Sequence, residues 1–249
     1  MRTDLLSTLT RRVLFAPLAD QGRADVVAVR LRTAITLGVL AEGEQLPAEA
    51  DLAAQFNISP VTLREALTQL RDQGLVTTKR GRGGGTVVTA GRPDQLRAAA
   101  EQARPLSGLD LRDLADWRRA VAAESAALAA RRASAENVAL LERGSDRLST
   151  AGDEVEARRA DSRFLIELAA AAQSVRLSTS MIGLQVEYAP LLTLAYVDTG
   201  VRSTVSQLFE ATVRAVRDAE PDVARGCVVR AVDHVAGRVA ELRTRGWAV

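Results

Sequence analysis

The sequence is poor in cysteine, histidine and aromatic residues. Cys227 and His234 are the single members of their kinds, and aromatic residues make up 3% of the 249 positions. One cysteine excludes an internal disulfide and a zinc site built on cysteine pairs. One histidine excludes a metal site that needs several imidazoles. We therefore predict no catalytic or structural centre built on these residue types.

Long apolar runs are also missing. The N-terminus carries Arg2, Asp4 and Arg11 and has no apolar stretch of the kind found in secretory signal peptides. The most apolar segment, residues 189–197, is about half as long as a membrane-spanning helix requires, and it contains Pro190. These features predict a cytoplasmic protein without a membrane partner.

What the sequence does contain is typical of a globular protein. Hydrophobic residues make up 47% and charged residues 26%, and the length is ample for two domains. The alternative of an enzyme built on a helical bundle has no support. The glycines at 83–85 do not lie between a strand and a helix, as a nucleotide loop requires, and no Ser/His/Asp set is present.

The first part of the chain predicts three helices followed by a hairpin. Residues 1–23 have only a weak pattern and are expected to form an N-terminal arm. Helical periodicity covers residues 24–37, and a second helix is expected to begin at Pro47. Ser59 and Pro60 have the character of an N-cap and a first helical residue, which predicts a third helix that ends near Gly74, with Val61 on its apolar side. Two β-prone runs, 75–78 and 86–89, flank a glycine-rich turn.

The second part predicts helices only. Residues 91–108, which include Pro93 and Pro105, are expected to form a linker. Helices are then expected near 110–132, 134–150, 153–172, 174–197, 200–218 and 221–244. The fold class is therefore mainly α: a DNA-binding type of unit at 24–90 and an all-α bundle of six or seven helices at 109–246.

Three helices and a two-stranded wing form a winged helix-turn-helix, which binds double-stranded DNA. Positive charge supports this reading, because residues 59–92 contain six basic and two acidic side chains. The third helix is expected to enter the major groove and the wing to follow the phosphates. The predicted contacts are Ser59, Thr62 and Arg64 on the helix and Lys79, Arg80, Arg82 and Gly83 in the wing. The alternatives are a solvated helix face for Arg64 and an ordinary charged hairpin tip for the wing.

Residues 31–88 resemble the winged helix of GntR-type regulators. The matching runs are LRTAI at 31–35, LPAE at 46–49, VTLREALTQL at 61–70 and GLV at 74–76, in the family's order and spacing. Two positions depart from the pattern, because members often carry DNA-contacting arginines where this chain has Ala50 and Pro60. The resemblance implies a transcription regulator that is a homodimer on a palindromic operator. The alternative is an effector-binding or protein-interaction module whose DNA reading has weakened.

Residues 110–244 resemble the FCD ligand domain of FadR-like GntR regulators, through DLRDLADWR at 110–118, LAA at 128–130 and DSRFL at 161–165. That resemblance implies a divalent metal held by one aspartate and three histidines. Here Asp161 is present, but Leu165, Phe209 and Ala231 stand at the histidine positions, and His234 lies one turn beyond the last of them. We therefore expect no bound metal and no other cofactor.

The same alignment suggests an effector pocket lined by Arg118, Asp161, Leu165, Phe209 and Ala231. Arg118 can bind an acidic group of a small-molecule effector, or it can form a buried ion pair with Asp161. Apolar replacements of three imidazoles favour an acyl-type effector, unless side chains fill the cavity. The large rings of Trp117, Tyr188 and Tyr196 can line a pocket or pack in the core. The sequence as a whole predicts a ligand-responsive repressor.

Overall fold

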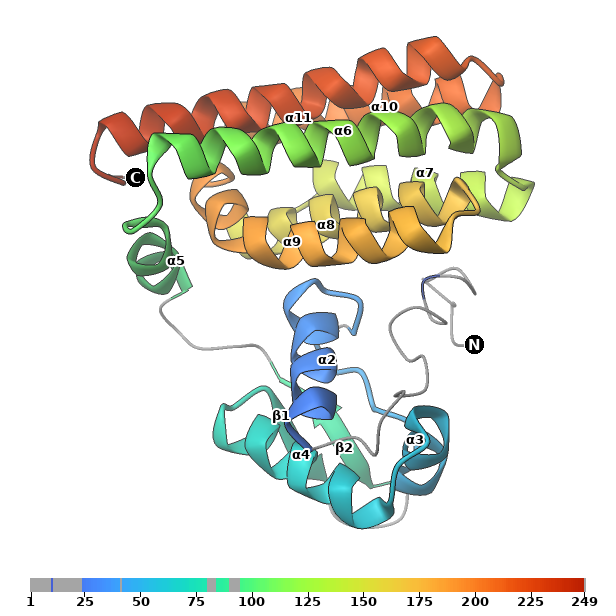
Figure 1. Cartoon of the computed structure of the whole chain (residues 1–249), viewed down its shortest axis with the longest axis vertical. Helices are drawn as coiled ribbons and strands as arrows, with labels where there is room; N and C mark the ends of the chain where they lie inside the picture. Colours follow the sequence, from blue (N-terminus) through green and yellow to red (C-terminus); the bar gives the residue numbers. More distant parts are fainter. Residues whose placement is uncertain (1–9, 11–23, 41, 80–83, 90–94, 249) are drawn as a thin grey trace. The chain divides into compact units, whose positions relative to one another are not determined.

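A computed structural model describes residues 10, 24–40, 42–79, 84–89 and 95–248 of the chain. It is mainly α-helical with one small sheet, which confirms the predicted fold class (Figure 1). Contacts divide the chain close to Pro93 into two compact units. Each unit is described separately below.

The first unit contains three helices and a hairpin. The helices are α2 (Ala24–Thr36), α3 (Glu49–Phe56) and α4 (Pro60–Asp72), and the strands are β1 (Val76–Lys79) and β2 (Gly85–Val88). The strands pair antiparallel, with Val76 opposite Val88 and Lys79 opposite Gly85. Its core is formed by apolar side chains that repeat at helical spacing, as predicted, among them Leu31, Leu52, Phe56, Leu63, Leu67 and Leu70.

The turn between α3 and α4 follows from its residues. Asn57 takes the left-handed conformation (φ 55°) that ends α3, and Asn is among the few residues that adopt it readily. Ser59 caps α4 and Pro60 is its first residue, as predicted. Gly74, also left-handed at φ 70°, follows the end of α4. Because these caps fix where α4 begins, they also determine which residues form its first turn.

Two sequence predictions in this unit were wrong in detail. The second helix begins at Glu49 and not at Pro47, because the segment before it is extended and pairs with β2. The Leu46 amide donates to the Thr86 carbonyl at 2.9 Å, and Gln45 forms a bridge with Val87. Val61 was assigned to the apolar side of the third helix, but it is 61% exposed.

The second unit contains seven helices in the described part of the chain. They are α5 (Gln95–Ala103), α6 (Gly108–Arg132), α7 (Ala135–Ser149), α8 (Glu154–Ala171), α9 (Val175–Ala195), α10 (Thr199–Arg217) and α11 (Pro221–Thr244). The six long helices lie close to the predicted ranges. The region expected to be a linker contains α5, which packs against α9.

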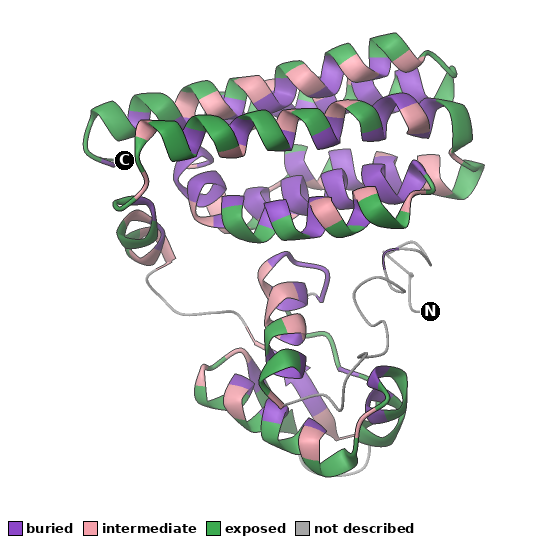
Figure 2. Cartoon of the chain, in the orientation of Figure 1, coloured by how far each residue is buried: buried purple, intermediate pink, exposed green. Residues whose placement is uncertain are grey.

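The bundle is arranged around α8. This helix contacts α6, α7 and α9, while α6 packs lengthwise against α11 and α11 against α10 (Figures 1 and 2). Alanine is frequent where α6 and α8 are buried, which allows close approach of the helix backbones. Serine or aspartate side chains cap α6 through α10 by accepting amide hydrogen bonds, as Ser134 does for α7. No helix among the described residues combines the length and apolar character that crossing a bilayer requires.

Candidate nucleic-acid interface and ligand site

The leading edge of α4 carries three of the predicted DNA contacts. The Ser59 hydroxyl accepts the Thr62 amide at 3.1 Å and lies 2.9 Å from the Thr62 hydroxyl. Ser59 is exposed, Thr62 is half-buried, and Arg64 follows with an exposed side chain. Pro60 has no backbone N–H, and the Thr62 and Leu63 amides donate to Ser59, so the Val61 amide is the one that this first turn can offer to an anion. The N-terminal end of α4 therefore presents the hydroxyls of Ser59 and Thr62 and the guanidinium of Arg64.

Arg64 is held in place by an ion pair that sequence reasoning missed. Its Nε lies 3.1 Å from a carboxylate oxygen of Glu49, the first residue of α3, and the two side chains are 65% and 46% exposed. Exposed pairs of this kind contribute little free energy, between about 0 and 1 kcal/mol. A phosphate or a base edge can therefore compete with Glu49 for this guanidinium at small cost.

Val61 adds an apolar contact to the same edge. Val61 lies between Ser59 and Thr62 in the sequence, and its exposed side chain presents two methyl groups to the outside. In the major groove, thymine methyl groups offer a matching apolar contact. The apolar character of Val61 suggested a place in the core, but at 3.6 residues per turn it lies about 160° from Leu63, on the side of the helix opposite the buried face.

The wing is partly described. Lys79 is exposed at the end of β1, whereas Arg80, Arg82 and Gly83 lie outside the described residues. The Gln45 side-chain amide donates to the Gly84 carbonyl at 3.1 Å. A Cβ at Gly85 would lie 2.6 Å from that amide nitrogen. Glycine at position 85 therefore lets Gln45 fasten the wing to the segment before α3.

In the second unit, Arg118 and Asp161 form the predicted buried ion pair. Arg118 is on α6 and Asp161 on α8, and the side chains are 0% and 1% exposed. An Nη2 atom of Arg118 lies 2.5 Å from Oδ1 of Asp161, and the Tyr196 hydroxyl donates to Oδ2 at 2.6 Å. Both carboxylate oxygens are therefore occupied by protein donors.

Arg118 also has unused hydrogen-bonding capacity. Its guanidinium carbon lies 4.7 Å from the centre of the Tyr188 ring, a cation–π contact. Its Nε and Nη1 atoms have no hydrogen-bond partner among the described residues. Burial is the largest single influence on the pKa of Arg118 and lowers it, but the interactions with Asp161, Tyr188 and Tyr196 together outweigh burial, so the net pKa is raised. Burial, followed by the charge of Asp161, raises the pKa of Tyr196 well above its ordinary value.

The residues at the family's metal position do not suit a metal ion. Leu165, Phe209 and Ala231 are at most 1% exposed, and the Phe209 ring stacks on Phe164 with centres 3.8 Å apart. Apolar carbon offers no lone pair to a cation, and the Asp161 oxygens already accept from Arg118 and Tyr196. Within the described ranges, no group of three or more His, Cys, Asp or Glu side chains is placed to hold a metal.

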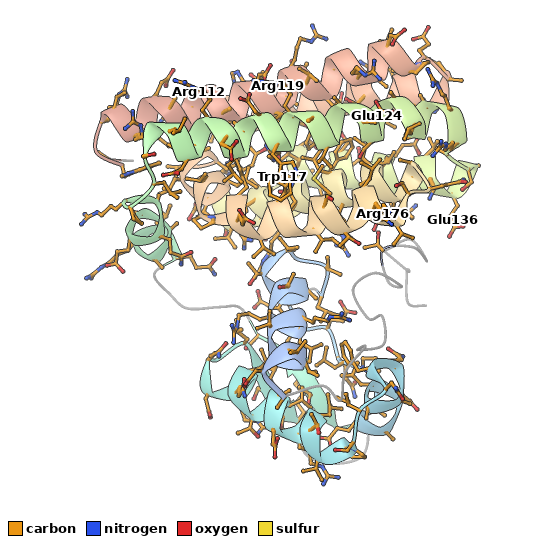
Figure 3. The ribbon with its side chains drawn as sticks, in the orientation of Figure 1. Arg112, Trp117, Arg119, Glu124, Glu136 and Arg176 are labelled. Atoms are coloured by element: carbon orange, nitrogen blue, oxygen red, sulfur yellow. The ribbon has the colours of Figure 1, made fainter. Side chains whose placement is uncertain are left out.

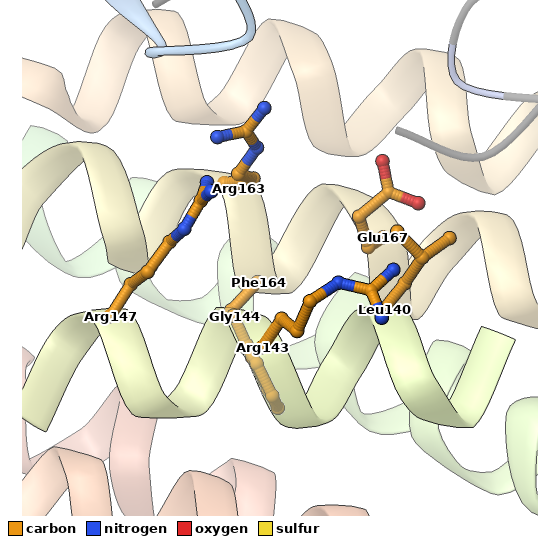
Figure 4. A pocket seen from close by; sticks show the side chains of 7 residues that line it. All are labelled: Leu140, Arg143, Gly144, Arg147, Arg163, Phe164 and Glu167. Atoms are coloured by element: carbon orange, nitrogen blue, oxygen red, sulfur yellow. The ribbon is translucent and has the colours of Figure 1, made fainter. Parts of the chain in front are cut away.

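Three hollows differ in size and location. One between α7 and α8 has a volume of about 10 Å³, room for a single water, with Arg143, Arg147 and Arg163 around it (Figure 4). Burial, with the charge of Arg143, lowers the pKa of Arg147 there. A second hollow, of about 150 Å³, lies beside the wing in the first unit.

The third hollow is a groove between α6 and α11 with a volume of about 330 Å³. Tyr188 of α9 also lines it. None of the five residues predicted to line an effector pocket belongs to these three hollows. All five are buried in the bundle, at no more than 1% exposure, and sequence reasoning missed the groove because it depends on how two helices fit side by side.

Comparison with known proteins covers both units. Residues 23–88 match the family described as "Bacterial regulatory proteins, gntR family", and residues 113–234 match the FCD domain. An HTH-type transcriptional regulator of Mycobacterium gastri, RmpR, is 38% identical over 217 residues, which are 85% of this chain and 78% of that protein.

Two further similarities are more limited, one in the length matched and the other in sequence identity. The HTH-type transcriptional repressor NanR of Escherichia coli O1:K1 is 37% identical over 78 residues, 31% of this chain and 30% of that protein. The solved structure of E. coli McbR/YncC covers 96% of this chain and 99% of its own with a TM-score of 0.52 and 17% identity, which shows likeness of fold. On the matches to both units and to RmpR, the chain belongs to the GntR family and is a DNA-binding transcription regulator with an FCD effector-binding domain.

Proposed function

We propose that this regulator is a repressor that binds a palindromic operator as a homodimer and releases it when a small molecule binds the FCD domain. The observation that carries the proposal is the exposed leading edge of α4, where Ser59, Thr62 and Arg64 stand together. In a helix-turn-helix this edge enters the major groove, and two copies related by a twofold axis read two half-sites. Such a protein acts in the cytoplasm, where the DNA is.

The contacts divide into two classes. Arg64 can form two hydrogen bonds with guanine, while Ser59 and Thr62 can donate to phosphate oxygens. Lys79, with Arg80 and Arg82 in the wing, can neutralise phosphates, and Gly83 permits close approach of the backbone. The repressor assignment is supported by NanR, a repressor that is 37% identical to this chain over 78 residues.

The proposed effector is of acyl type and needs no metal. Its support is the residues at the family's ligand position: Leu165, Phe209 and Ala231 are apolar and at most 1% exposed, so this position lacks the polar partners that a small hydroxy acid requires. An apolar molecule with one anionic group suits such a domain better.

The test is DNA binding by fluorescence anisotropy, with the upstream region of the chain's own gene at several salt concentrations. Arg64→Ala should weaken specific binding by roughly tenfold or more, and should lower the salt dependence by about one phosphate contact if Arg64 clamps the backbone. The matched control is Arg97→Ala on α5, whose Nε also lies 3.1 Å from a glutamate, Glu101, at comparable exposure.

Two outcomes contradict the proposal. Equal affinity of Arg64→Ala and the unchanged protein would remove α4 from the interface. Absence of any specific DNA binding would favour the second candidate, an effector-binding or protein-interaction module with weakened DNA reading. The observation on its side is that Ala50 and Pro60, both exposed, offer no charge at positions where family members often carry arginine.

A further inference from the structure

We propose that the groove between α6 and α11 is the effector site, and that it binds a single acyl chain with one anionic head group. This inference deepens the proposed function, on which it rests, by naming a site outside the closed centre of the bundle. The groove is lined along its length by apolar or small side chains and by arginines at its ends. The residues that determine its chemistry are Leu111, Arg112, Ala115, Arg119, Val239 and Arg243.

The two helices run antiparallel, which gives the groove two different ends. At one end Gly108 of α6 lies beside Arg243 of α11, because a Cβ at Gly108 would be 2.8 Å from an Nη atom of Arg243. At the other end Arg119 of α6 meets Asp233 of α11, with Nε and a carboxylate oxygen 2.6 Å apart. Figure 3 shows Arg112 and Arg119 along α6, on the side that faces α11.

The charges at the two ends are not equivalent. Arg119 is neutralised twice, by Asp233 and by Asp116 at 2.7 Å. Arg112 and Arg243 form no ion pair with any described residue. An anion is therefore attracted to the Arg112–Arg243 end and repelled by the carboxylates at the other end. This asymmetry orients a ligand that has one head and one tail.

The dimensions suit such a ligand. Arg119 is seven positions beyond Arg112, so the tail section is about 10 Å long at the rise of an α-helix. The volume of about 330 Å³ lies at the lower limit of small-molecule sites. Leu111, Ala115 and Val239 are at most 8% exposed and form an apolar floor. A medium-length acyl chain fills this space, whereas a small polar acid would leave the floor uncovered.

Tyr188 connects the groove to the centre of the bundle. Its ring lines the groove and also contacts the guanidinium of Arg118, whose partner Asp161 binds Tyr196. A chain lying on Tyr188 would press on a side chain that is already packed against a buried charge. The groove is therefore placed to change the packing of α6, α8 and α9 together.

The experiment is calorimetric titration of the full-length protein with the saturated carboxylates hexanoate, octanoate, decanoate and dodecanoate. Each added methylene should tighten binding by up to about fourfold until the groove is full. Octanol, which has the tail of octanoate without its charge, should bind roughly tenfold more weakly. The double variant Arg112→Gln/Arg243→Gln should likewise bind octanoate roughly tenfold more weakly than the unchanged protein does. Its control, Arg131→Gln/Arg230→Gln, removes two exposed arginines from the same helices outside the groove and should bind as the unchanged protein does.

A second variant keeps the test independent of charge. Ala240→Leu places a larger side chain in the groove and should abolish octanoate binding, while Ala120→Leu, at an exposed α6 position outside the groove, should not. Thermal melting verifies that each variant folds. Octanoate binding that survives both groove variants would overturn the proposal, as would no binding by any of the four carboxylates. Loss of dimerisation in Ala240→Leu would also overturn it, by showing that the groove is a subunit interface.

DNA binding measured on the same samples separates this inference from the proposed function. Specific DNA binding without carboxylate binding would refute the groove alone. Carboxylate binding without specific DNA binding would support the groove and refute the function as a repressor.

Discussion

Replacing Asp161 by alanine should destabilise the bundle strongly, because it leaves the Arg118 charge buried without its partner. Arg118 is fully enclosed, and Asp161 provides its one hydrogen-bond acceptor among the described residues. Removal of one member of a buried pair costs about 3–5 kcal/mol, against a total stability of about 5–15 kcal/mol for a typical protein. Tyr196→Phe, which removes one hydrogen bond to the same carboxylate, should cost less, about 1.5–3 kcal/mol.

The measurement is urea unfolding at neutral pH, followed by tryptophan fluorescence. Both tryptophans of the chain, Trp117 and Trp247, belong to the second unit, so the signal reports the bundle and not the winged helix. Trp247 is buried and its emission should shift on unfolding. The double variant Arg118→Met/Asp161→Leu should recover most of the loss, because it removes both charges and leaves apolar side chains in their place.

Two results would refute this reasoning. A loss below about 1 kcal/mol for Asp161→Ala would mean that water or another group neutralises Arg118. A double variant as unstable as Asp161→Ala would mean that the packing of the aspartate, and not its charge, stabilises this region. Asp161→Ala keeps Arg118 and Tyr188, so loss of their cation–π contact does not account for the loss of stability in that variant.

Three further predictions follow from other features. Burial, followed by the charge of Asp161, raises the pKa of Tyr196 in the folded state, so the unfolded chain loses this proton first as pH rises and stability should fall above about pH 10. Urea titrations of Tyr196→Phe, which lacks the titrating group, should show a smaller fall, and an equal fall in both proteins would count against the raised pKa of Tyr196. Ser59→Ala should destabilise α4 by about 1 kcal/mol and weaken operator binding, whereas Ser59→Asp should restore the helix cap without restoring phosphate binding. Melting followed by circular dichroism measures the cap, and fluorescence anisotropy measures DNA binding. Equal melting temperatures of all three proteins would mean that Ser59 does not stabilise α4 as a cap. Zinc should leave the melting temperature unchanged, since three apolar residues occupy the ligand positions, and a rise that EDTA reverses would contradict the metal-free expectation.

Most of the fold was predictable because its signals are local. Helical periodicity, the Ser59 and Ser134 caps and the glycine at position 74 depend on neighbours a few residues away, and the observed elements follow them closely. The second helix was extended too far because pairing of residues 43–46 with β2 competes with Pro47 as a helix start. The paired residues lie about forty positions apart in the sequence, so no local sequence pattern indicates that they pair.

The candidate sites were predictable in unequal measure. The pairing of Arg118 with Asp161 could be proposed from the family alignment, as one of two alternatives. The Glu49–Arg64 pair and the Tyr196 hydrogen bond could not, since each requires the crossing of two helices to be known. The α6–α11 groove was out of reach for the same reason, because small residues on two distant helices create it together.

The packing of α11 along α6 has a consequence for biosynthesis. Helix α6 can pack against α11 only after α11 has left the ribosome. The contacts among the described residues of the winged helix, in contrast, span fewer than seventy residues. The DNA-binding unit can therefore mature on the nascent chain before the effector unit exists. A chain that ends before α11 should fold its DNA-binding unit but not the complete effector-binding bundle, so it would keep the part that binds DNA and lose the part that responds to a ligand.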